Sequence, residues 1–468
     1  MLLVAAALLP ITALIPIAPG LVAMVEADWT SEGYGFVAFS PLLAFAYVPL
    51  MCVLMAIVKW GLLGRVRPGT YSIWSGFYVR FWIVRQLGML ALELLHPIYA
   101  TLFVRPWFRL MGASVGARAE ISTAAAVVHN LVNLGAEGFI ADGVVLGAAR
   151  FVPGAIVLAP TVIGQRTFIG NSAVVPGGTA IGDNALIGVL SRPPDDAALA
   201  ATAGSTWFGS PPLRLPSRQV VTLFDEEARF NPPRRLVVAR LMMETIRTIL
   251  PLSIFISLLS LLLSIVGDLV DLPHPGWTVA VAFVPLYVAL VLAIGLSVIL
   301  LKWLVVGHYV PVTVPLWSFF VWRSELVTST FENLAVNLLL EPLRGTPWLP
   351  AYFRLLGAKI GRRVFMDTTD LTEFDLVTIG DDAALNDAAG LQTHLFEDRV
   401  MKVSHVTVGA RATVGSLAIV LYDAVIGDGA ELGDLSVLMK GEALPAGTAW
   451  EGPPARPVGR RLRTNTGR

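Results

Sequence analysis

Cysteine and charge are both scarce in this sequence. Cys52 is the single cysteine among 468 residues, which excludes an intrachain disulfide, a zinc cluster held by cysteines and redox chemistry by a thiol pair. Charged residues make up only 15% of the chain, the formal net charge is zero, and no long basic run occurs. The charge pattern of a nucleic-acid-binding protein is therefore missing.

Long apolar runs are abundant instead. Hydrophobic residues make up 55% of the chain and the mean hydropathy is +0.70, as is typical of membrane proteins. Four runs without charge are long enough to cross about 30 Å of hydrocarbon: 2–25, 34–58, 248–267 and 277–301. The first run has no basic residue before its apolar part, so we expect a membrane helix there rather than a signal peptide. The sequence predicts two membrane hairpins.

The charges that flank these runs differ in sign between the two ends of each hairpin. Only acidic residues stand at the hairpin tips: Glu26, Asp28, Glu32, Asp268 and Asp271. Basic residues gather at the opposite ends: Lys59, Arg65, Arg67, Arg229, Arg234, Arg235, Arg240, Arg247 and Lys302. Because basic residues favour the cytoplasmic side, we expect a multi-pass protein of the cell membrane whose remaining domains are cytoplasmic.

The chain contains an internal duplication. "KWGLLGRVRPGTYSIWSGFYVRF" from Lys59 aligns without a gap with "KWLVVGHYVPVTVPLWSFFVWRS" from Lys302, at a shift of 243 residues. "FRLMGASVG" from Phe108 then aligns with "FRLLGAKIG" from Phe353 at a shift of 245, which holds through the rest of both copies. Each copy is predicted to contain a membrane hairpin, an aromatic connector that lies at the membrane interface, and a soluble domain.

The soluble domains repeat with a period of six residues. Aliphatic side chains recur at Ile163, Ile169, Val175, Ile181 and Ile187, and again at Val408, Val414, Val420, Ile426, Leu432, Leu438 and Leu444. Glycine follows most of them, where the backbone has to turn. This period fits neither a helix nor a meandering strand, but it fits a parallel β-helix whose inward aliphatics stack about 4.8 Å apart.

The predicted fold class is membrane α plus all-β, in two tandem units. The first unit has a hairpin (1–67), a connector (68–111) and a β-helix (112–218). A linker (219–247) leads to the second hairpin (248–306), connector (307–356) and β-helix (357–457), and a basic tail (458–468) follows.

The ladder resembles the hexapeptide repeats of left-handed β-helix acyltransferases. This resemblance implies left-handed winding, which the general rule for β crossovers does not give. It also implies that "GPPAR" near the end of the second ladder borders a coenzyme A groove, through Gly452, Pro453 and Arg456. The first copy has Ser-Pro-Pro-Leu-Arg at the corresponding place, so we expect the first β-helix to be non-catalytic.

In both copies one gap in the ladder is seventeen residues long, from Leu146 to Ile163 and from Leu391 to Val408. A loop therefore leaves the β-helix at the same coil in each. Only the second loop is polar, and Ala149 of the first aligns with its histidine. The second loop and the coil before it carry Asn386, Asp387, Gln392, His394, Glu397, Asp398, Arg399 and Lys402.

Acyl transfer from a thioester requires that the attacking amine or hydroxyl lose a proton. The resemblance to acyltransferases implies His394 as the catalytic base, a role worth about 10²–10⁴ in rate, with Asp398 or Glu397 to orient the imidazole. We expect the substrate to contact the other polar residues: Asn386, Asp387, Gln392, Arg399 and Lys402. The alternative is that His394 caps a loop whose charges are merely solvated. A zinc site as in γ-class carbonic anhydrases requires a third histidine beside His394 and His405, so no metal is expected.

The whole chain resembles the carboxy-terminal region of membrane-bound non-ribosomal peptide synthetases of the ε-poly-lysine synthetase type. The residues that carry the likeness are "LNDAAGLQTHLFEDRVMK" from Leu385 and "STWFGSPPLRLPSR" from Ser205, together with the duplicated plan. The resemblance implies condensation of an amine with an aminoacyl thioester on the phosphopantetheine of a carrier protein. The sequence has no P-loop or carrier-type serine and has two units where such synthetases have three. We therefore expect an adenylation and carrier module in trans, or a third β-helix unit, as partner.

Two other functions fit the same residues. One is an O- or N-acetyltransferase that uses acetyl coenzyme A, and the other is a non-catalytic scaffold that holds a peptide synthetase at the membrane. Because related acyltransferases are trimers, we also predict that the two β-helices lie side by side and leave a third position open.

Overall fold

The structure is a computed structural model that describes residues 15–30, 34–216, 223–270 and 274–458. Unit 1 contains Met1–Arg218 and Val238–Leu290, and unit 2 contains Gln219–Val237 and Val291–Arg468. The second hairpin is thus divided between the units within its second helix, since its residues up to Leu290 belong with unit 1 and those from Val291 with unit 2.

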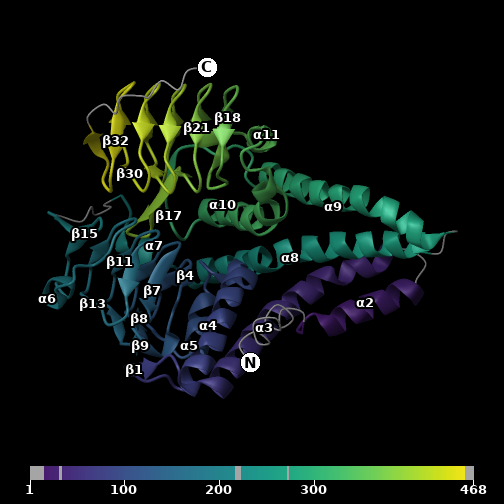
Figure 1. Cartoon of the computed structure of the whole chain (residues 1–468), viewed down its shortest axis with the longest axis horizontal. Coiled ribbons are helices and arrows are strands. Elements are labelled where there is room, and N and C mark those ends of the chain that lie inside the picture. The colour runs from purple at the N-terminus through teal and green to yellow at the C-terminus, as the bar shows by residue number, and fades with distance from the viewer. Residues whose placement is uncertain (1–14, 31–33, 217–222, 271–273, 459–468) are drawn as a thin grey trace. The chain divides into compact units, whose positions relative to one another are not determined.

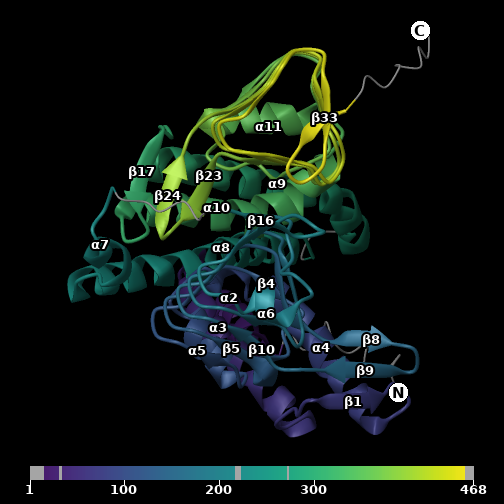
Figure 2. The same cartoon turned by 90° about the vertical axis from the view of Figure 1, so that its left-hand side faces the viewer.

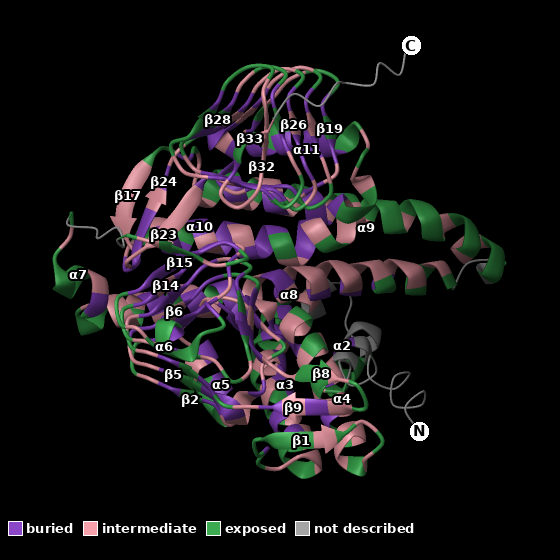
Figure 3. Cartoon of the chain, turned by 60° about the vertical axis from the view of Figure 1, so that its left-hand side comes forward, coloured by how far each residue is buried: buried purple, intermediate pink, exposed green. Residues whose placement is uncertain are grey.

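Among the described residues, three helices are long and apolar enough to cross a membrane. They are α3 (Ser40–Leu62), α8 (Arg234–Val270) and α9 (Pro275–Val305), traced in Figure 1. Most of α9 is exposed or half-buried (Figure 3), as expected of a helix that faces lipid. Residues 1–14 of the other predicted span lie outside the described part of the chain, and α2 (Ala18–Thr30) covers its end.

The end of the predicted linker forms the first turns of α8. Arg240 in these turns is buried and pairs with Glu244 at 2.6 Å and with Glu120 of strand β3 (Glu120–Ile121) at 2.9 Å. The Glu244 carboxylate also accepts the backbone N–H of Leu102 at 2.9 Å. Hydropathy does not predict this part of the helix, because its charged residues make the segment polar. In the structure these charges are paired inside unit 1.

Unit 1 contains three sheets of short strands that stack in parallel. The first has β2 (Ser114–Val115), β5 (Val132–Leu134), β10 (Thr161–Ile163) and β13 (Ala180–Ile181). The second has β3, β6 (Phe139–Ile140), β11 (Phe168–Ile169), β14 (Leu186–Ile187), β15 (Thr206–Phe208) and the antiparallel β16 (Leu213–Leu215). The third has β4 (Ala124–Ala125), β7 (Val144–Ala148) and β12 (Val174–Pro176).

Unit 2 has the same plan, and Figure 2 shows its coils end-on as a triangle. The first sheet has β18 (Lys359–Ile360), β20 (Val377–Ile379), β25 (Val406–Val408), β28 (Ala424–Ile426) and β31 (Ala443–Leu444). The second has β19 (Phe365–Met366), β21 (Ala384–Leu385), β26 (Thr413–Val414), β29 (Glu431–Leu432), β32 (Ala449–Glu451) and the antiparallel β33 (Arg456–Val458). The third has β22 (Gly390–Gln392), β27 (Ile419–Leu421) and β30 (Val437–Leu438).

The aliphatic ladder fills the interior of each coil stack. In unit 2, register pairs link Ile379, Val408, Ile426 and Leu444 on one face, and every residue of this row is buried. Leu391, Val420 and Leu438 form the row of a second face. The parallel coils that the six-residue period predicts are therefore confirmed, whereas their left-handed winding stays a prediction.

Each long gap in the ladder folds as an antiparallel hairpin that is joined by a strand from the connector. In unit 1 the order is β1 (Gly69–Ser72), β9 (Ala155–Leu158), β8 (Arg150–Val152). In unit 2 it is β17 (Val312–Pro315), β24 (Val400–Val403), β23 (His394–Glu397). The connector of unit 2 continues into α10 (Phe319–Thr330), where the Ser318 hydroxyl caps the first turn by accepting the N–H of Val321.

Candidate functional site

His394 is the first residue of β23, where the chain leaves the coil. It pairs with Val403 in β24, and β17 supports the other edge of β24. The imidazole is half-buried, with 24% of its side chain exposed. Strand pairing on one side and the coil on the other therefore fix this side chain while part of it stays exposed.

The imidazole contacts a buried carboxylate. The Nδ1 atom of His394 lies 2.8 Å from Oε2 of Glu373, whose side chain is fully buried. The same carboxylate accepts the hydroxyl of Thr393 at 2.6 Å and the hydroxyl of Ser324, from α10, at 2.9 Å. Three donors from two segments of the chain, α10 and the start of the hairpin, thus converge on one carboxylate.

These three donors keep the Glu373 carboxylate ionised. Burial raises the pKa of Glu373, but His394, Thr393 and Ser324 together outweigh burial and lower the pKa below its ordinary value. An ionised carboxylate only accepts hydrogen bonds, so Nδ1 of His394 is the donor and the lone pair is on Nε2. This is the tautomer that a general base requires.

The backbone of Glu373 is strained. Its φ of 33° lies in the left-handed region, which side chains other than glycine rarely adopt. The short helix η6 (Phe374–Leu376) follows, and the Phe374 ring packs against Phe331 and Phe353 with centroids 5.1 and 5.8 Å away. The residue that follows Glu373 is thus packed among aromatic rings.

The acidic partner predicted for His394 is corrected by the structure. Asp398 or Glu397 was expected to orient the imidazole, and Glu373 makes that contact. Strand residues alternate between faces, so His394 lies with Phe396, whose ring centroid is 5.7 Å away, while Glu397 belongs to the opposite face. There Glu397 pairs with Lys402 at 2.5 Å and with Lys440.

The tip of the hairpin docks on the short helix α7 (Glu226–Phe230). Asp398 forms an ion pair with Arg229, and the guanidinium of Arg399 lies 5.0 Å from the ring centroid of Phe230. Only 2% of Arg399 is exposed. A side chain this buried is not available for the predicted contact of Arg399 with a substrate. Asp398 and Arg399 instead hold the hairpin tip against α7.

The remaining predicted residues fall into two groups at different corners of the coil. Gln392 ends β22, two residues before His394, whereas Lys402 lies on the same hairpin but pairs with Glu397 on the face opposite to His394. A second group lies at the corner that precedes β22 and consists of Asn386, Asp387, Gly452, Pro453 and Arg456. There the Asn386 amide donates to the carbonyl of Val414 at 2.9 Å, Asp387 pairs with Arg344, and the N–H of Gly452 donates to the Ser436 hydroxyl at 2.9 Å.

Sequence reasoning missed Glu373, Ser324 and Thr393. The duplication contains the signal that finds them, because the aligned residues of the first copy are Val128, Phe81 and Ala148. Val128 and Phe81 lie in one hydrophobic cluster of unit 1, against which Ala149, the counterpart of His394, is packed. A polar residue in one copy at a position that is apolar in the other is therefore informative.

No protein-family model matches this chain. The chain is 42% identical over 423 residues to the delta-poly-L-ornithine synthetase of Acinetobacter baumannii (strain AB307-0294). The match covers 89% of this chain but 31% of that protein, so the chain spans about a third of the length of the curated relative it matches.

Solved structures share local likeness with parts of the chain. A maltose O-acetyltransferase from Clostridium difficile 630 is 17% identical with a TM-score of 0.19, over 24% of this chain and 73% of that one. A hexapeptide-repeat-containing acetyltransferase from Vibrio cholerae O1 biovar eltor, in complex with acetyl coenzyme A, is 16% identical with a TM-score of 0.21, over 25% and 77% of the two chains.

Proposed function

We propose that this chain catalyses amide bond formation between an amine and an aminoacyl thioester, as one part of a non-ribosomal peptide synthetase. The observation that carries the proposal is the environment of His394. A buried, ionised Glu373 fixes its tautomer, and the ring keeps partial access to solvent. The likeness to a delta-poly-L-ornithine synthetase supports the choice of peptide bond formation among the reactions that such a base can assist.

The proposed reaction has two steps. The amine nitrogen attacks the thioester carbonyl carbon, and Nε2 of His394 takes the proton that the nitrogen loses as the C–N bond forms. The tetrahedral intermediate then collapses, the C–S bond breaks, and the imidazolium returns the proton to the leaving thiolate. Glu373 stabilises the imidazolium between the two steps and remains ionised throughout.

The proposed donor is an aminoacyl group on the phosphopantetheine of a carrier protein. The relative is about three times as long as the matched region, so we place the adenylation and carrier functions in another module, in trans or elsewhere in a longer chain. We further propose that the two units are tandem copies anchored in the cell membrane with left-handed, cytoplasmic β-helices, of which the second is catalytic.

The test uses the full chain in lipid nanodiscs. It is mixed with ornithinyl-S-pantetheine and free ornithine, the first substrate to try given the relative, and the dipeptide is quantified by mass spectrometry. We expect His394→Ala to lower the rate by about 10²–10⁴, whereas His405→Ala, at an exposed position of the next strand connection, leaves it unchanged.

Three outcomes oppose the proposal. Full activity of a folded His394→Ala chain contradicts the assignment of the base. Acetyl transfer from acetyl coenzyme A without dipeptide formation favours the acetyltransferase. No transfer from either donor favours a scaffold.

A further inference from the structure

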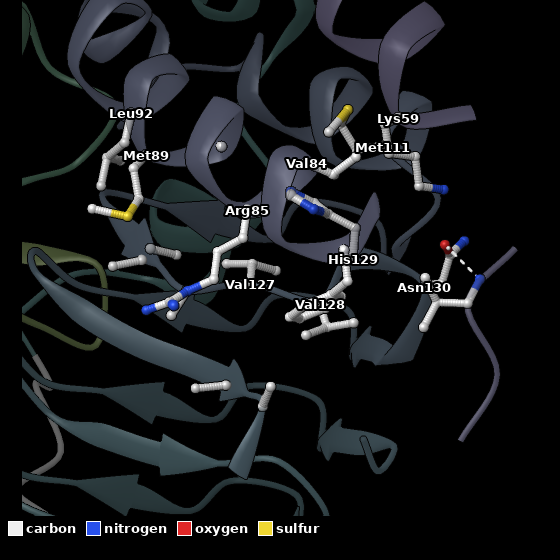
Figure 4. Close-up of a pocket in the computed structure, with 18 of the residues that line it drawn as sticks. Lys59, Val84, Arg85, Met89, Leu92, Met111, Val127, Val128, His129 and Asn130 are labelled. Carbon is white, nitrogen blue, oxygen red and sulfur yellow. Dashed lines mark hydrogen bonds between the residues drawn. The ribbon is translucent and has the colours of Figure 1, made fainter. Parts of the chain in front are cut away.

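Unit 1 contains a cavity at the place where unit 2 carries the proposed catalytic cluster. It has a volume of about 390 Å³ and lies between α4 (Gly76–Leu94), the end of α3 and the first coils. Figure 4 shows Met89 and Leu92 at one end, Lys59 and Asn130 at the other, and His129 between them. A cavity of this size is large enough for a ligand.

The duplication relates this cavity to the catalytic cluster residue by residue. The counterparts of Ser324, Tyr309, Glu373 and His394 are Phe81, Val66, Val128 and Ala149, and all four line the cavity. The hydroxyls, the carboxylate and the imidazole are thus replaced by hydrocarbon. This part of the wall favours apolar ligand groups over polar ones.

One charged group in the wall is buried. In unit 2, Lys302 pairs with Asp375 at 2.8 Å, and Asp375 also accepts the backbone N–H of Tyr309 at 3.1 Å. The counterpart of Asp375 is Asn130, which accepts the N–H of Val66 at 3.2 Å. The backbone contact is kept, but the negative charge opposite the lysine is gone.

Lys59, the counterpart of Lys302, therefore has no carboxylate in the position that Asp375 occupies beside Lys302. It is only 3% exposed, and among the described residues its ammonium has no hydrogen-bond partner. The ammonium lies 3.2 Å from the centroid of the Trp60 ring, which offsets only part of the cost of burying a cation. An anion brought by a ligand would complete this site.

The other titratable groups of the cavity do not supply that anion, and burial raises the pKa of Tyr99 to about 12, so its hydroxyl is neutral. Burial, and then the charge of Lys59, lowers the pKa of His129 to about 3, so its imidazole is neutral at physiological pH. Arg85 and Glu93 are exposed and carry opposite charges. Lys59 is thus the group that selects the charge of a ligand.

We propose that the cavity of unit 1 binds an anionic membrane lipid, with one acyl chain between α4 and the coils and the headgroup phosphate on Lys59. The source is the bilayer because Lys59 stands in the last turn of α3, a helix that is long and apolar enough to cross it. Basic residues at such helix ends meet anionic headgroups. This inference does not depend on the proposed catalytic function.

The test measures lipid binding by the full chain in a non-ionic detergent. Native mass spectrometry and thermal unfolding follow titration with dioleoyl phosphatidylglycerol or dioleoyl phosphatidylcholine. We expect one tightly bound lipid and a preference of about five- to tenfold for phosphatidylglycerol, since one lysine near an anionic surface is worth about 1 kcal/mol.

Two variants separate the headgroup from the chain. Asn130→Asp supplies the counter-ion that Lys302 has in unit 2, so the preference should vanish while one lipid still binds. Gly88→Leu fills the cavity, and it should fold because an added Cβ meets no atom within 4 Å. It should lose the bound lipid, whereas Gly267→Leu, with equal space in α8 and outside the cavity, should keep it.

Four results contradict the proposal. They are equal binding of both lipids by the unmodified chain, retention of the lipid by Gly88→Leu, retention of the preference by Asn130→Asp, and stabilisation by inorganic phosphate alone to the same extent as by phosphatidylglycerol. The last would indicate a free-anion site.

Discussion

Glu373 is the residue on which the proposed site depends most, because a buried carboxylate is tolerated only while its donors are present. His394, Thr393 and Ser324 supply those donors. Removal of the charge leaves the three donors with a poorer acceptor, and the loss is measurable as stability as well as activity.

Glu373→Gln should show a pH-dependent loss of stability. The folded pKa of Glu373 lies below its ordinary value of 4.5, so the native state binds fewer protons than the unfolded state, and the charge stabilises the fold above that pH. We expect the variant to be about 1–3 kcal/mol less stable at pH 7, with the difference shrinking as the pH falls below 4.5 and through the folded pKa. Denaturant unfolding at several pH values measures it.

The control for this experiment is Glu431→Gln, an exposed glutamate on the same β-helix. Its stability should follow the unmodified chain at every pH. A loss for Glu373→Gln that is equal at pH 7 and well below pH 4.5 would show that its charge has no part in stability.

At this scale the sequence predicted a role for His394 but did not predict its contact with Glu373. His394 is visible because it interrupts a ladder that is otherwise nearly free of functional side chains. Its carboxylate stands 21 residues earlier, in a segment whose path across the coil the six-residue period does not describe. Asp398 and Glu397 are nearer in sequence, but the alternation of strand faces and the turn at the hairpin tip take them elsewhere.

At the scale of elements, the β23–β24 hairpin has to be held against the coil for His394 to keep its place. Arg229 of α7 and Asp398 make the ion pair at its tip. The pair is largely shielded from solvent, so the free energy of the interaction between its two charges is larger than in a surface ion pair.

Arg229→Ala should loosen the hairpin without unfolding the β-helix. Displacement of a catalytic group by about 1 Å costs up to about 10²-fold in rate, so we expect a large fall in kcat with a small change in melting temperature. Hydrogen exchange over 394–403 should rise. The exposed Arg235 provides the matched control, and an unchanged kcat for Arg229→Ala would argue that the hairpin needs no such anchor.

The ladder makes a separate prediction about stability. Leu438 is fully buried in the row of Leu391 and Val420, whereas Leu435, three residues earlier, is 57% exposed. Leu438→Ala should cost about 2–5 kcal/mol and Leu435→Ala less than about 0.5 kcal/mol, as measured by chemical denaturation. Equal costs would mean that the stacked row is not the core of the coil.

The period of six sufficed to predict these rows, because one residue in each turn must point inward wherever the coil is regular. It could not predict that 234–247 is helix. Arg240 and Glu244 make that segment look solvated, and only their pairing with Glu120 inside unit 1 explains their burial.

At the scale of the whole molecule, the predicted orientation in the membrane follows from the charges at the ends of α3, α8 and α9. It can be tested in cells after replacement of Cys52 by serine. A cysteine reagent that does not cross membranes should label Thr30→Cys and not Ser416→Cys, because the hairpin tip is predicted outside and the β-helix inside. The reverse pattern would overturn the orientation.

The duplication could be recognised in the sequence because two shifts, 243 and 245, align both copies. The different roles proposed for the two copies could not be predicted, since they depend on a few side chains that come together only in the fold. In unit 2 they form a polar cluster around Glu373, and in unit 1 their counterparts line an apolar cavity.

The central claim is that His394 and Glu373 act as one unit in amide formation, and a double-mutant cycle tests it most directly. Dipeptide formation is measured for His394→Ala, Glu373→Gln and the double variant, each checked for folding by its melting temperature. If Glu373 acts through the imidazole, the double variant should be no slower than His394→Ala alone, because groups that act as a unit are not additive. Losses that multiply in the double variant would show independent roles and contradict the account.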